Sequence, residues 1–325
     1  MAAPAGFGVL WSELTPALAS ADVAYANLEG PTAHGRTRHG EAPDPGRVFD
    51  GAVYSGWNRF NYHPSLARDL VASGLDVVST ANNHALDRGP VGIDRTLDAL
   101  DDEALAHTGT RRRRTKDAWH TITTARGIRI AWLACATHVN HLPDPHRQVL
   151  RCSEAVARVP ALAADADAVI VTPHWGPEYV QRPNRKQRRL ARRLIDAGAL
   201  AVIGSHPHVL QPWAHRTTRS GREGLIVYSL GNFVSHQREL PRRTSIVLFV
   251  ALDRGSDGDV YVSQARYLPL EVTVDSEGAA FSVGAARPGT AAYQHATSVL
   301  GASAVLAPRE SSAALRACDE PPATK

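Results

Sequence analysis

The sequence predicts an α/β fold in which a sheet-rich sandwich is covered by helices. Two patterns carry this prediction. Up to about residue 203, apolar segments of strand length alternate with segments of helical period, and from residue 225 to 274 strand-like segments follow one another with little helix between them. The 325 residues are 43% hydrophobic and 21% charged, which are ordinary globular values and exclude wholesale disorder. No apolar run reaches the roughly 18 residues of a membrane-spanning helix.

The first half of the chain alternates between the two periods. Three leucines spaced by four residues predict a short helix within residues 10–20, and residues 22–29 form a buried strand that ends in polar residues. Residues 30–61 are rich in Gly, Pro, His and Arg, which predicts an irregular loop. We then expect helices at 63–74 and 92–105, and strands at 75–80, 119–124 and 128–135.

The second half supplies two helices and most of the β structure. A helix at 153–164 precedes a strand at 168–172, and a helix at 184–197 carries an apolar stripe and stops at Gly198. Strands follow at 200–203, 225–230, 245–252, 260–267 and 270–274. No linker divides the chain, so residues 1–288 are taken as one domain. Residues 289–325 are rich in Ala, Ser and Pro and are expected to form a poorly ordered tail.

The cysteines and the first residues bear on the compartment. Cys135, Cys152 and Cys318 form an odd, sparse set, which argues against a disulfide framework and fits a reducing environment. The absence of CxxC and CxxH pairs argues against a thiolate zinc site. Residues 1–7 show no basic or apolar leader pattern. We therefore expect a cytoplasmic location for the chain as given, and an extracytoplasmic one if its true start lies upstream.

Basic residues are concentrated in two places, although the formal net charge is only +4. One cluster is Arg111–Arg114, and the other comprises Arg182, Arg185, Lys186, Arg188, Arg189, Arg192 and Arg193. The second cluster is either a solvated helix face or a positive field that attracts an anionic substrate. Aromatic residues are not interleaved with the arginines, so the pattern does not favour binding of nucleic acid strands.

Polar side chains follow four of the predicted strands directly. They are Asn27 and Glu29, then Asn82, Asn83 and His84, then His174, and finally His206 and His208. Because ligands gather at the carboxyl ends of strands in open α/β sheets, these residues are expected to converge on one cleft. Each has a structural alternative: the Asn-Asn-His turn can be turn chemistry alone, and a single histidine can be a core residue. Imidazole, carboxamide and carboxylate together instead favour manganese, iron or zinc.

Residues 76–89, DVVSTANNHALDRG, resemble the most characteristic motif of the CapA family of bacterial poly-γ-glutamate capsule synthesis proteins. Further segments are similar to that family: residues 21–31, 174–179, 195–212 and 227–234. The resemblance extends from about Phe7 to Leu270. It implies the calcineurin-like metallophosphoesterase fold, a four-layer sandwich of two mixed sheets flanked by helices.

The resemblance also implies roles. Glu29 corresponds to a carboxylate that bridges two metals, and the remaining implied ligands are Asn83, His174, His206 and His208. His84 corresponds to the histidine that gives a proton to the leaving oxygen. Two divalent ions (Mn, Fe or Zn) about 3.5–4 Å apart would hold an oxyanion and activate a water. Residues expected to contact substrate or support the ligands are Asn27, Asn82, Asp87, Trp175, Glu178 and Asn232.

The chain departs from the family at its beginning. The family opens with a strand ending in Gly-Asp, and that aspartate binds one metal, whereas no Asp precedes Asp22 here and Glu13 lies in a helical stretch. Either the true start lies upstream of Met1, which we favour, or a core strand and half a metal site are lost. The predicted function is a metal-dependent hydrolase acting on an anionic substrate such as polyglutamate or a phosphate ester. The alternative is a non-catalytic protein that binds or assembles an anionic polymer.

Overall fold

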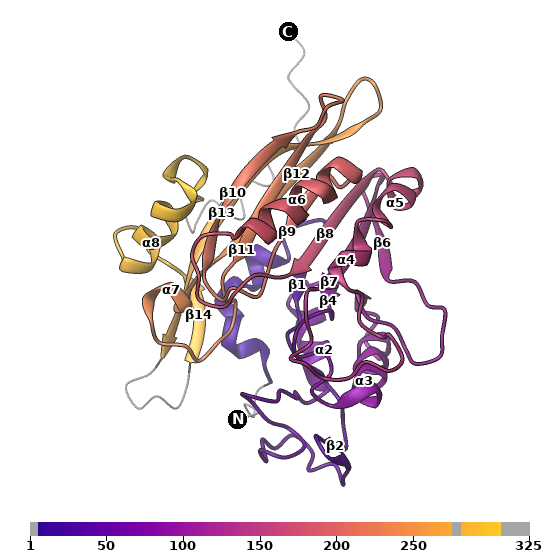
Figure 1. Cartoon of the computed structure of the whole chain (residues 1–325). Helices are drawn as coiled ribbons and strands as arrows, with labels where there is room; N and C mark the ends of the chain where they lie inside the picture. Colours follow the sequence, from indigo (N-terminus) through magenta and orange to yellow (C-terminus); the bar gives the residue numbers. More distant parts are fainter. Residues whose placement is uncertain (1–5, 275–280, 307–325) are drawn as a thin grey trace.

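The computed structural model describes residues 6–274 and 281–306, and its largest element is a six-stranded mixed sheet (Figure 1). The strand order is β10-β11-β9-β8-β7-β6, in which β11, β9, β8 and β7 are parallel and the two edge strands are antiparallel. Its strands are β6 (His120–Ala125), β7 (Ile128–Ala136), β8 (Ala168–His174), β9 (Ala201–Ile203), β10 (Leu210–Thr217) and β11 (Glu223–Leu230).

Two smaller sheets and a short hairpin complete the β structure. The parallel sheet β1-β4-β5 consists of β1 (Tyr25–Asn27), β4 (Val77–Ser79) and β5 (Ala106–Thr108). The antiparallel sheet consists of β12 (Thr244–Arg254), β13 (Val260–Val274) and β14 (Phe281–Ala285). Strands β2 (Arg36–Thr37) and β3 (Gly40–Glu41) form a hairpin within the predicted loop at 30–61.

Side-chain alternation along β7 separates two apolar layers. Ala131, Leu133 and Cys135 are buried against the side covered by α4 (Cys152–Ala155), α5 (Val159–Asp165) and α6 (Arg185–Ala197). Ile130 and Trp132 face the opposite way, where the Tyr25 ring of β1 stacks on Trp132 with ring centroids 5.2 Å apart. The period-2 alternation of a strand buried on both faces therefore joins the two β layers.

Four helices from the first part of the chain cover the smaller sheets. They are η1 (Gly8–Leu14), α1 (Thr15–Leu18), α2 (Ser65–Ala72) and α3 (Gly89–Asp102). Trp11, Leu66 and Leu97 from these helices share one buried cluster with Val78 of β4 and Leu270 of β13. Helices, a six-stranded sheet, a second β layer and further helices thus form four layers. This confirms the predicted α/β sandwich with mixed sheets and flanking helices.

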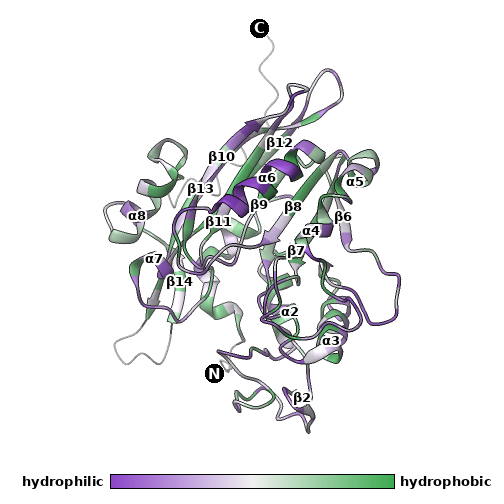
Figure 2. Ribbon diagram, in the orientation of Figure 1, coloured by the Kyte–Doolittle hydropathy of each residue, from purple (hydrophilic) through white to green (hydrophobic). Residues whose placement is uncertain are grey.

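Helix α6 shows how local sequence fixes one of these layers. Asn184 accepts a hydrogen bond from the Gln187 backbone N–H while the Gln187 side chain bonds back to Asn184, which is a complete capping box. Ala191, Leu194 and Ile195 are buried against the sheet. The basic residues point outward and colour the helix as the most hydrophilic one in Figure 2.

The predicted tail is partly wrong. Residues Ala291–Leu300 form helix α8, and Ala302–Ala304 add a 3₁₀ turn. Ala296 and Leu300 pack against Leu210, Ile246 and Tyr267, and the Thr290 side chain caps the helix. Small apolar residues repeating every four positions were hidden by the Ala/Ser-rich composition. Residues 307–325 lie outside the described part of the chain. The last short helix, α7 (Leu240–Arg243), precedes β12.

The predicted absence of disulfides is also wrong, because Cys135 and Cys152 form one. Both cysteines are buried, with Cys135 near the end of β7 and Cys152 at the start of α4. Seventeen positions separate them, and only the tertiary path of the intervening loop brings their Cα atoms to 4.9 Å. The cysteine argument for a reducing compartment therefore no longer holds. In the described ranges, no helix combines the length and apolarity needed to cross a membrane.

The disulfide has a measurable consequence for stability. Closing a loop of this length should stabilise the folded chain by about 3 kcal/mol, because it restricts the unfolded chain. In urea titrations, the free energy of unfolding of the wild type should therefore fall by about that amount when dithiothreitol is added. The free energy of unfolding of the C135A/C152A variant should not change with the reductant. A wild type with the same unfolding midpoint in both conditions would contradict the pairing.

Candidate metal centre

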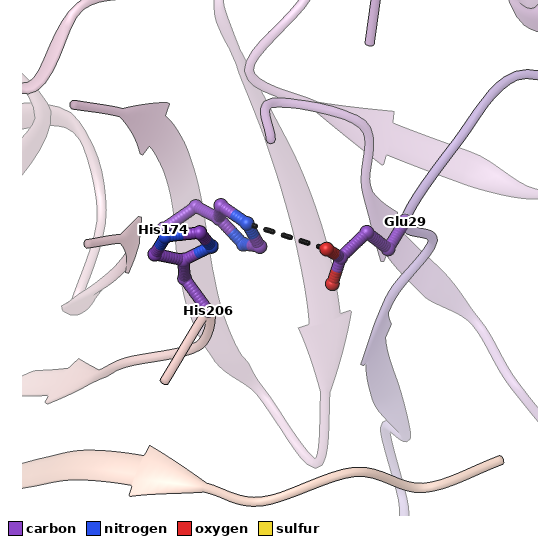
Figure 3. A group of neighbouring side chains, drawn as sticks. All are labelled: Glu29, His174 and His206. Carbon is purple, nitrogen blue, oxygen red and sulfur yellow. Dashed lines mark ion pairs between the residues drawn. The ribbon is translucent and has the colours of Figure 1, made fainter. Parts of the chain in front are cut away.

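The predicted ligands meet at the carboxyl ends of strands from two sheets. Glu29 follows β1, Asn83 follows β4, His174 ends β8, and His206 and His208 follow β9. The ligand atoms of Glu29, His174 and His206 all lie within 4.8 Å of one another, and Figure 3 shows the three side chains facing a common point. Parallel strand ends, contributed by segments far apart in sequence, therefore assemble the cluster.

Glu29 occupies the centre of the cluster. Its Oε1 lies 3.7 Å from His174 Nε2 and 3.5 Å from His208 Nε2, so it faces two histidines at once. The other oxygen, Oε2, accepts a hydrogen bond from Asn27 Nδ2 at 3.3 Å. Burial raises the pKa of the Glu29 carboxyl, while His208 and His84 act in the opposite direction. The position between His174 and His208 is the one expected of a bridging carboxylate.

The two asparagines of the Asn-Asn-His turn after β4 make different contacts. The Asn82 amide donates to the Leu28 carbonyl at 2.7 Å and its Oδ1 accepts from His84 N, so Asn82 ties the turn to the segment that carries Glu29. Asn83 Oδ1 lies 2.8 Å from His174 Nε2, and its amide donates to Asn140 Oδ1 at 3.2 Å. Asn83 thus presents an oxygen to the cluster, as predicted from its position.

His174 is buried and held through both ring nitrogens. Its Nδ1 lies 2.9 Å from the Ser205 hydroxyl, which can donate or accept, while Nε2 faces Asn83 and Glu29. Burial, together with the neighbouring His206 and His208, holds the pKa of His174 well below its usual range. The ring is therefore neutral at physiological pH, the form in which an imidazole binds a metal.

His206 and His208 sit on an unusual backbone. Both have positive φ, +93° at His206 and +56° at His208. For non-glycine residues such conformations cost on the order of 1–3 kcal/mol and persist where the surrounding structure enforces them. Burial, reinforced by His208 and His138, lowers the pKa of His206 to about 3, so this ring is neutral as well.

His208 has a defined tautomer. Its Nδ1 lies 2.8 Å from Asn232 Oδ1, and the Asn232 amide donates to the backbone carbonyls of His208 and Arg242. Because a carboxamide oxygen only accepts, His208 carries a proton on Nδ1 and directs Nε2 at Glu29. Asn232 thus orients a predicted ligand, one of the two roles expected of it.

Two buried atoms of the cluster have no hydrogen-bond partner among the described residues: Glu29 Oε1 and His206 Nδ1. Unpaired buried polar atoms are rare because each costs free energy. His174 Nε2 lies 2.8 Å from Asn83 Oδ1 and 3.7 Å from Glu29 Oε1. Two ligand atoms that each bind one ion at about 2.1 Å are expected to lie roughly 3–3.5 Å apart, which is close to these distances. The residues present therefore fit a divalent ion, and nitrogen with oxygen donors suits zinc, manganese or iron.

A second group of possible ligands adjoins the first. Glu178, His206 and His208 also offer ligand atoms within 4.8 Å of one another, although Glu178 is exposed. Glu13 does not join either group, because its carboxylate bonds the backbone N–H of Ala285 on β14. A second carboxylate near His208 thus comes from the loop after β8.

His84 lies beside the cluster and pairs with Asp87. His84 Nδ1 is 2.7 Å from Asp87 Oδ2, and both side chains are buried. Asp87 also accepts from the Phe60 backbone N–H at 2.8 Å and from Arg59 Nη1 at 3.2 Å. The Phe60 ring packs edge-on against His84, with centroids 4.5 Å apart. His84 is therefore fixed through Nδ1, and Asp87 supports it without joining the Glu29 cluster.

One predicted pocket residue belongs elsewhere. Trp175 was expected to contact substrate or support the ligands, but its side chain is fully buried among Ala191 and Leu194 of α6. Its Nε1 donates to the Tyr228 carbonyl at 2.9 Å. Strand alternation explains the error, because the residue after an inward-facing His174 points to the opposite side of the sheet.

Sequence reasoning missed several residues that contact the predicted ones. They are Arg59, Phe60, Tyr62, His138, Asn140 and Ser205. Tyr62 donates to the Glu29 carbonyl at 3.0 Å. Most of them lie in loops without strand or helix periodicity, so no pattern placed them. Only Ser205, inside the Gly-Ser-His-Pro-His segment, could have been found from its neighbours.

Comparison with known proteins identifies the family of the chain. The model of the bacterial capsule synthesis protein family PGA_cap matches residues 2–237. The chain therefore belongs to the PGA_cap family. The matched range contains all five implied metal ligands and His84. The roles of these six residues in this chain stay predictions.

Two curated relatives extend the family assignment. The capsule biosynthesis protein CapA of Bacillus anthracis is 33% identical over 192 residues, covering 54% of this chain and 45% of that protein. The PGA biosynthesis protein CapA of Bacillus subtilis (strain 168) is 35% identical over 196 residues, covering 56% and 48%. This PGA_cap chain thus spans about half the length of the curated relatives it matches.

Solved structures resemble the fold at a distance. The NAD nucleotidase NadN of Haemophilus influenzae has a TM-score of 0.46 at 13% identity, covering 75% of this chain and 49% of that one. A putative 5′-nucleotidase of Staphylococcus aureus has a TM-score of 0.43 at 13% identity, covering 66% and 42%.

The neutral histidines predict how stability depends on pH. His174 and His206 have lowered pKa values in the folded chain, so below about pH 6.5 the unfolded chain binds more protons. Stability of the metal-free protein should therefore fall once the pH drops below about 6.5, with a slope that approaches about 1.4 kcal/mol per pH unit for each histidine. Glu29 acts in the opposite sense, because its pKa is raised, and offsets at most one of them.

Urea unfolding in the presence of EDTA at pH 7, 6 and 5 measures this dependence. The H174N/H206N variant, which lacks both titrating groups, should show a shallower slope. Equal slopes for the wild type and the variant would contradict the assignment of neutral, buried histidines.

Proposed function

We propose that this PGA_cap protein is a metal-dependent hydrolase that acts on an anionic substrate with chemistry of the phosphoesterase type. The observation that supports this most is the juxtaposition of two features. One is the buried cluster around Glu29, whose Oε1 lacks a hydrogen-bond partner. The other is the His84–Asp87 pair beside it. A metal cluster and an adjacent proton donor are the two components that hydrolysis of this type requires.

The geometry supports one assignment of the ligands. Glu29, Asn83, His174 and His206 would hold one divalent ion, and His208 with Glu29 and Glu178 would hold a second. Such ions, of manganese, iron or zinc, would supply Lewis-acid activation of water and stabilisation of negative charge. The neutral state of His174 and His206 keeps their lone pairs available at physiological pH.

His84 would act as the proton donor to the leaving oxygen. Its Nδ1 faces the Asp87 carboxylate, which accepts a proton-bearing nitrogen, so Nε2 is the nitrogen left to hold and give up the transferred proton. Asp87 stabilises the imidazolium electrostatically, as buried carboxylates do for catalytic histidines. The backbone N–H of Phe60 and the Arg59 guanidinium fix Asp87 in turn, and the Phe60 ring shields one side of His84 from water.

The exposed positive charge of α6 and the capsule-synthesis family of the chain both favour an anionic substrate. The exposed basic residues of α6 and of the loop before it, among them Arg182, Arg185 and Arg189, present a positive field. Such a field attracts anions and raises their local concentration. The curated relatives are named for capsule and PGA biosynthesis. Polyglutamate, cleaved at a γ-glutamyl amide, and a phosphate ester are the two substrates to test.

The same basic residues favour the second candidate function. A protein that binds or assembles an anionic polymer without cleaving it would use the exposed face of α6 and would not need His84. One variant distinguishes the two candidates: loss of His84 should slow hydrolysis strongly and leave polymer binding unchanged.

The His84→Ala variant tests the proposal. Hydrolysis of bis(p-nitrophenyl) phosphate and of γ-glutamyl substrates is measured with added Mn²⁺, together with metal content. Removal of the general acid should lower kcat by 10²- to 10⁴-fold while the metal content stays at the wild-type value. His215→Ala, an exposed residue on β10 that pairs with Leu225 of β11, serves as the matched control and should retain full activity.

Two outcomes would contradict the proposed hydrolase activity. One is a His84→Ala variant as active as the wild type. The other is a metal-loaded wild type that binds polyglutamate but turns over neither class of substrate, which would favour the polymer-binding candidate.

A further inference from the structure

His138 contacts the candidate metal centre although no motif contains it. It lies in the loop that follows β7, and its Nε2 is 3.3 Å from Nε2 of His206. The two rings meet edge to face, with centroids 4.9 Å apart and an interplanar angle of 76°. This geometry is that of a hydrogen bond between two imidazoles, one donating and the other accepting.

The second nitrogen of His206 decides which ring donates. His206 Nδ1 is buried and has no hydrogen-bond partner within the described residues, while Nε2 is engaged by His138. A neutral imidazole carries a single ring proton. If Nδ1 provides the lone pair for a metal, that proton resides on Nε2, and His138 Nε2 must be the acceptor.

The other two histidines are held in the same way. His174 is anchored by the Ser205 hydroxyl and His208 by Asn232, each through Nδ1, which leaves Nε2 for the cluster. Metal-binding histidines generally use their second ring nitrogen in this manner, and such partners fix the tautomer and orientation of the ring. His206 is the one member of the three that is anchored through Nε2.

We propose that His138 is the positioning residue of His206: it accepts a hydrogen bond from His206 Nε2–H and thereby directs Nδ1 to the metal. The proposal rests on the metal-binding role given to His206 under the proposed function. It adds a residue that neither the motifs nor the family resemblance assigns, and it specifies the ligating atom.

The loop that carries His138 is well fixed. The backbone N–H of Thr137 donates to the His174 carbonyl at 3.0 Å, and the Thr137 hydroxyl contacts the same carbonyl at 3.2 Å. Val139 is buried, and Asn140 accepts from the Asn83 amide. His138 is therefore set between two residues that are anchored to the site on either side of it.

His138 as a direct ligand fits the geometry less well. Among the described residues, it is in neither of the two groups whose ligand atoms lie within 4.8 Å of one another. It contacts His206 from the side that Nδ1 does not face. A ligand at that position would bind an ion through Nε2 of His206, and the unpaired Nδ1 would be left without a role.

The experiment compares three variants of the full chain with Zn²⁺ as the probe. Zinc affinity of the metal-free protein is measured by competition with a chromophoric chelator. His138→Ala should raise the Kd by 10- to 100-fold without lowering the number of ions bound, the usual effect of removing a histidine's supporting partner. His138→Gln, whose carbonyl oxygen can accept the same hydrogen bond, should restore much of the affinity. His141→Ala, an exposed histidine on the same loop, should bind zinc as the wild type does.

Long-range ¹H–¹⁵N correlation spectra of the zinc-loaded wild type give the independent readout, because they distinguish the tautomers of the His206 ring. The expected result is a proton on Nε2 and zinc on Nδ1. Zinc on Nε2, a Kd for His138→Ala within twofold of the wild type, or the loss of one bound ion in that variant would each overturn the proposal. A wild type that binds no zinc at these residues would instead overturn the proposed function.

Discussion

A buried carboxylate oxygen without a hydrogen-bond partner in the described protein, Oε1 of Glu29, is the constraint around which the site is organised. It faces His174 and His208, yet it accepts no hydrogen bond. Burial raises the pKa of this carboxyl and lowers those of His174 and His206, so neither of these two rings supplies positive charge at physiological pH. A buried charge is stable only when it is paired or bound to a metal. The cluster therefore has the electrostatics of a cation site.

The fold holds this cluster at strand ends and anchors it from behind. Each of the three clustered histidines has a partner on one ring nitrogen: Ser205, His138 or Asn232. The left-handed backbone at His206 and His208 is a conformation that L residues adopt only under constraint. Between them, the Pro207 carbonyl accepts a hydrogen bond from the Tyr179 backbone N–H. The loop with His138 is tied down at its base by the Cys135–Cys152 disulfide. Stability and metal geometry are thus linked through the same segment.

The sequence predicted the parts of this site that obey strand periodicity. Glu29, Asn83 and His174 lie at or just after the ends of parallel strands, and the shared direction of those strands brings them together. His138 was not predictable, because its position depends on the path of an irregular loop and on tertiary pairing of β7 with β8. The disulfide was not predicted for the same reason, because its two cysteines become neighbours only when that loop has its folded path. Helix α8 was missed because its apolar stripe consists mainly of alanine.

The most direct test is an anomalous diffraction map from crystals of the protein loaded with zinc. If the strand ends form a metal centre, the map will show a peak at about 2.0–2.2 Å from Glu29 Oε1, Asn83 Oδ1, His174 Nε2 and His206 Nδ1. Zinc located away from these atoms, or no peak among them in protein that retains the fold, would contradict the central claim that the strand ends form a metal centre.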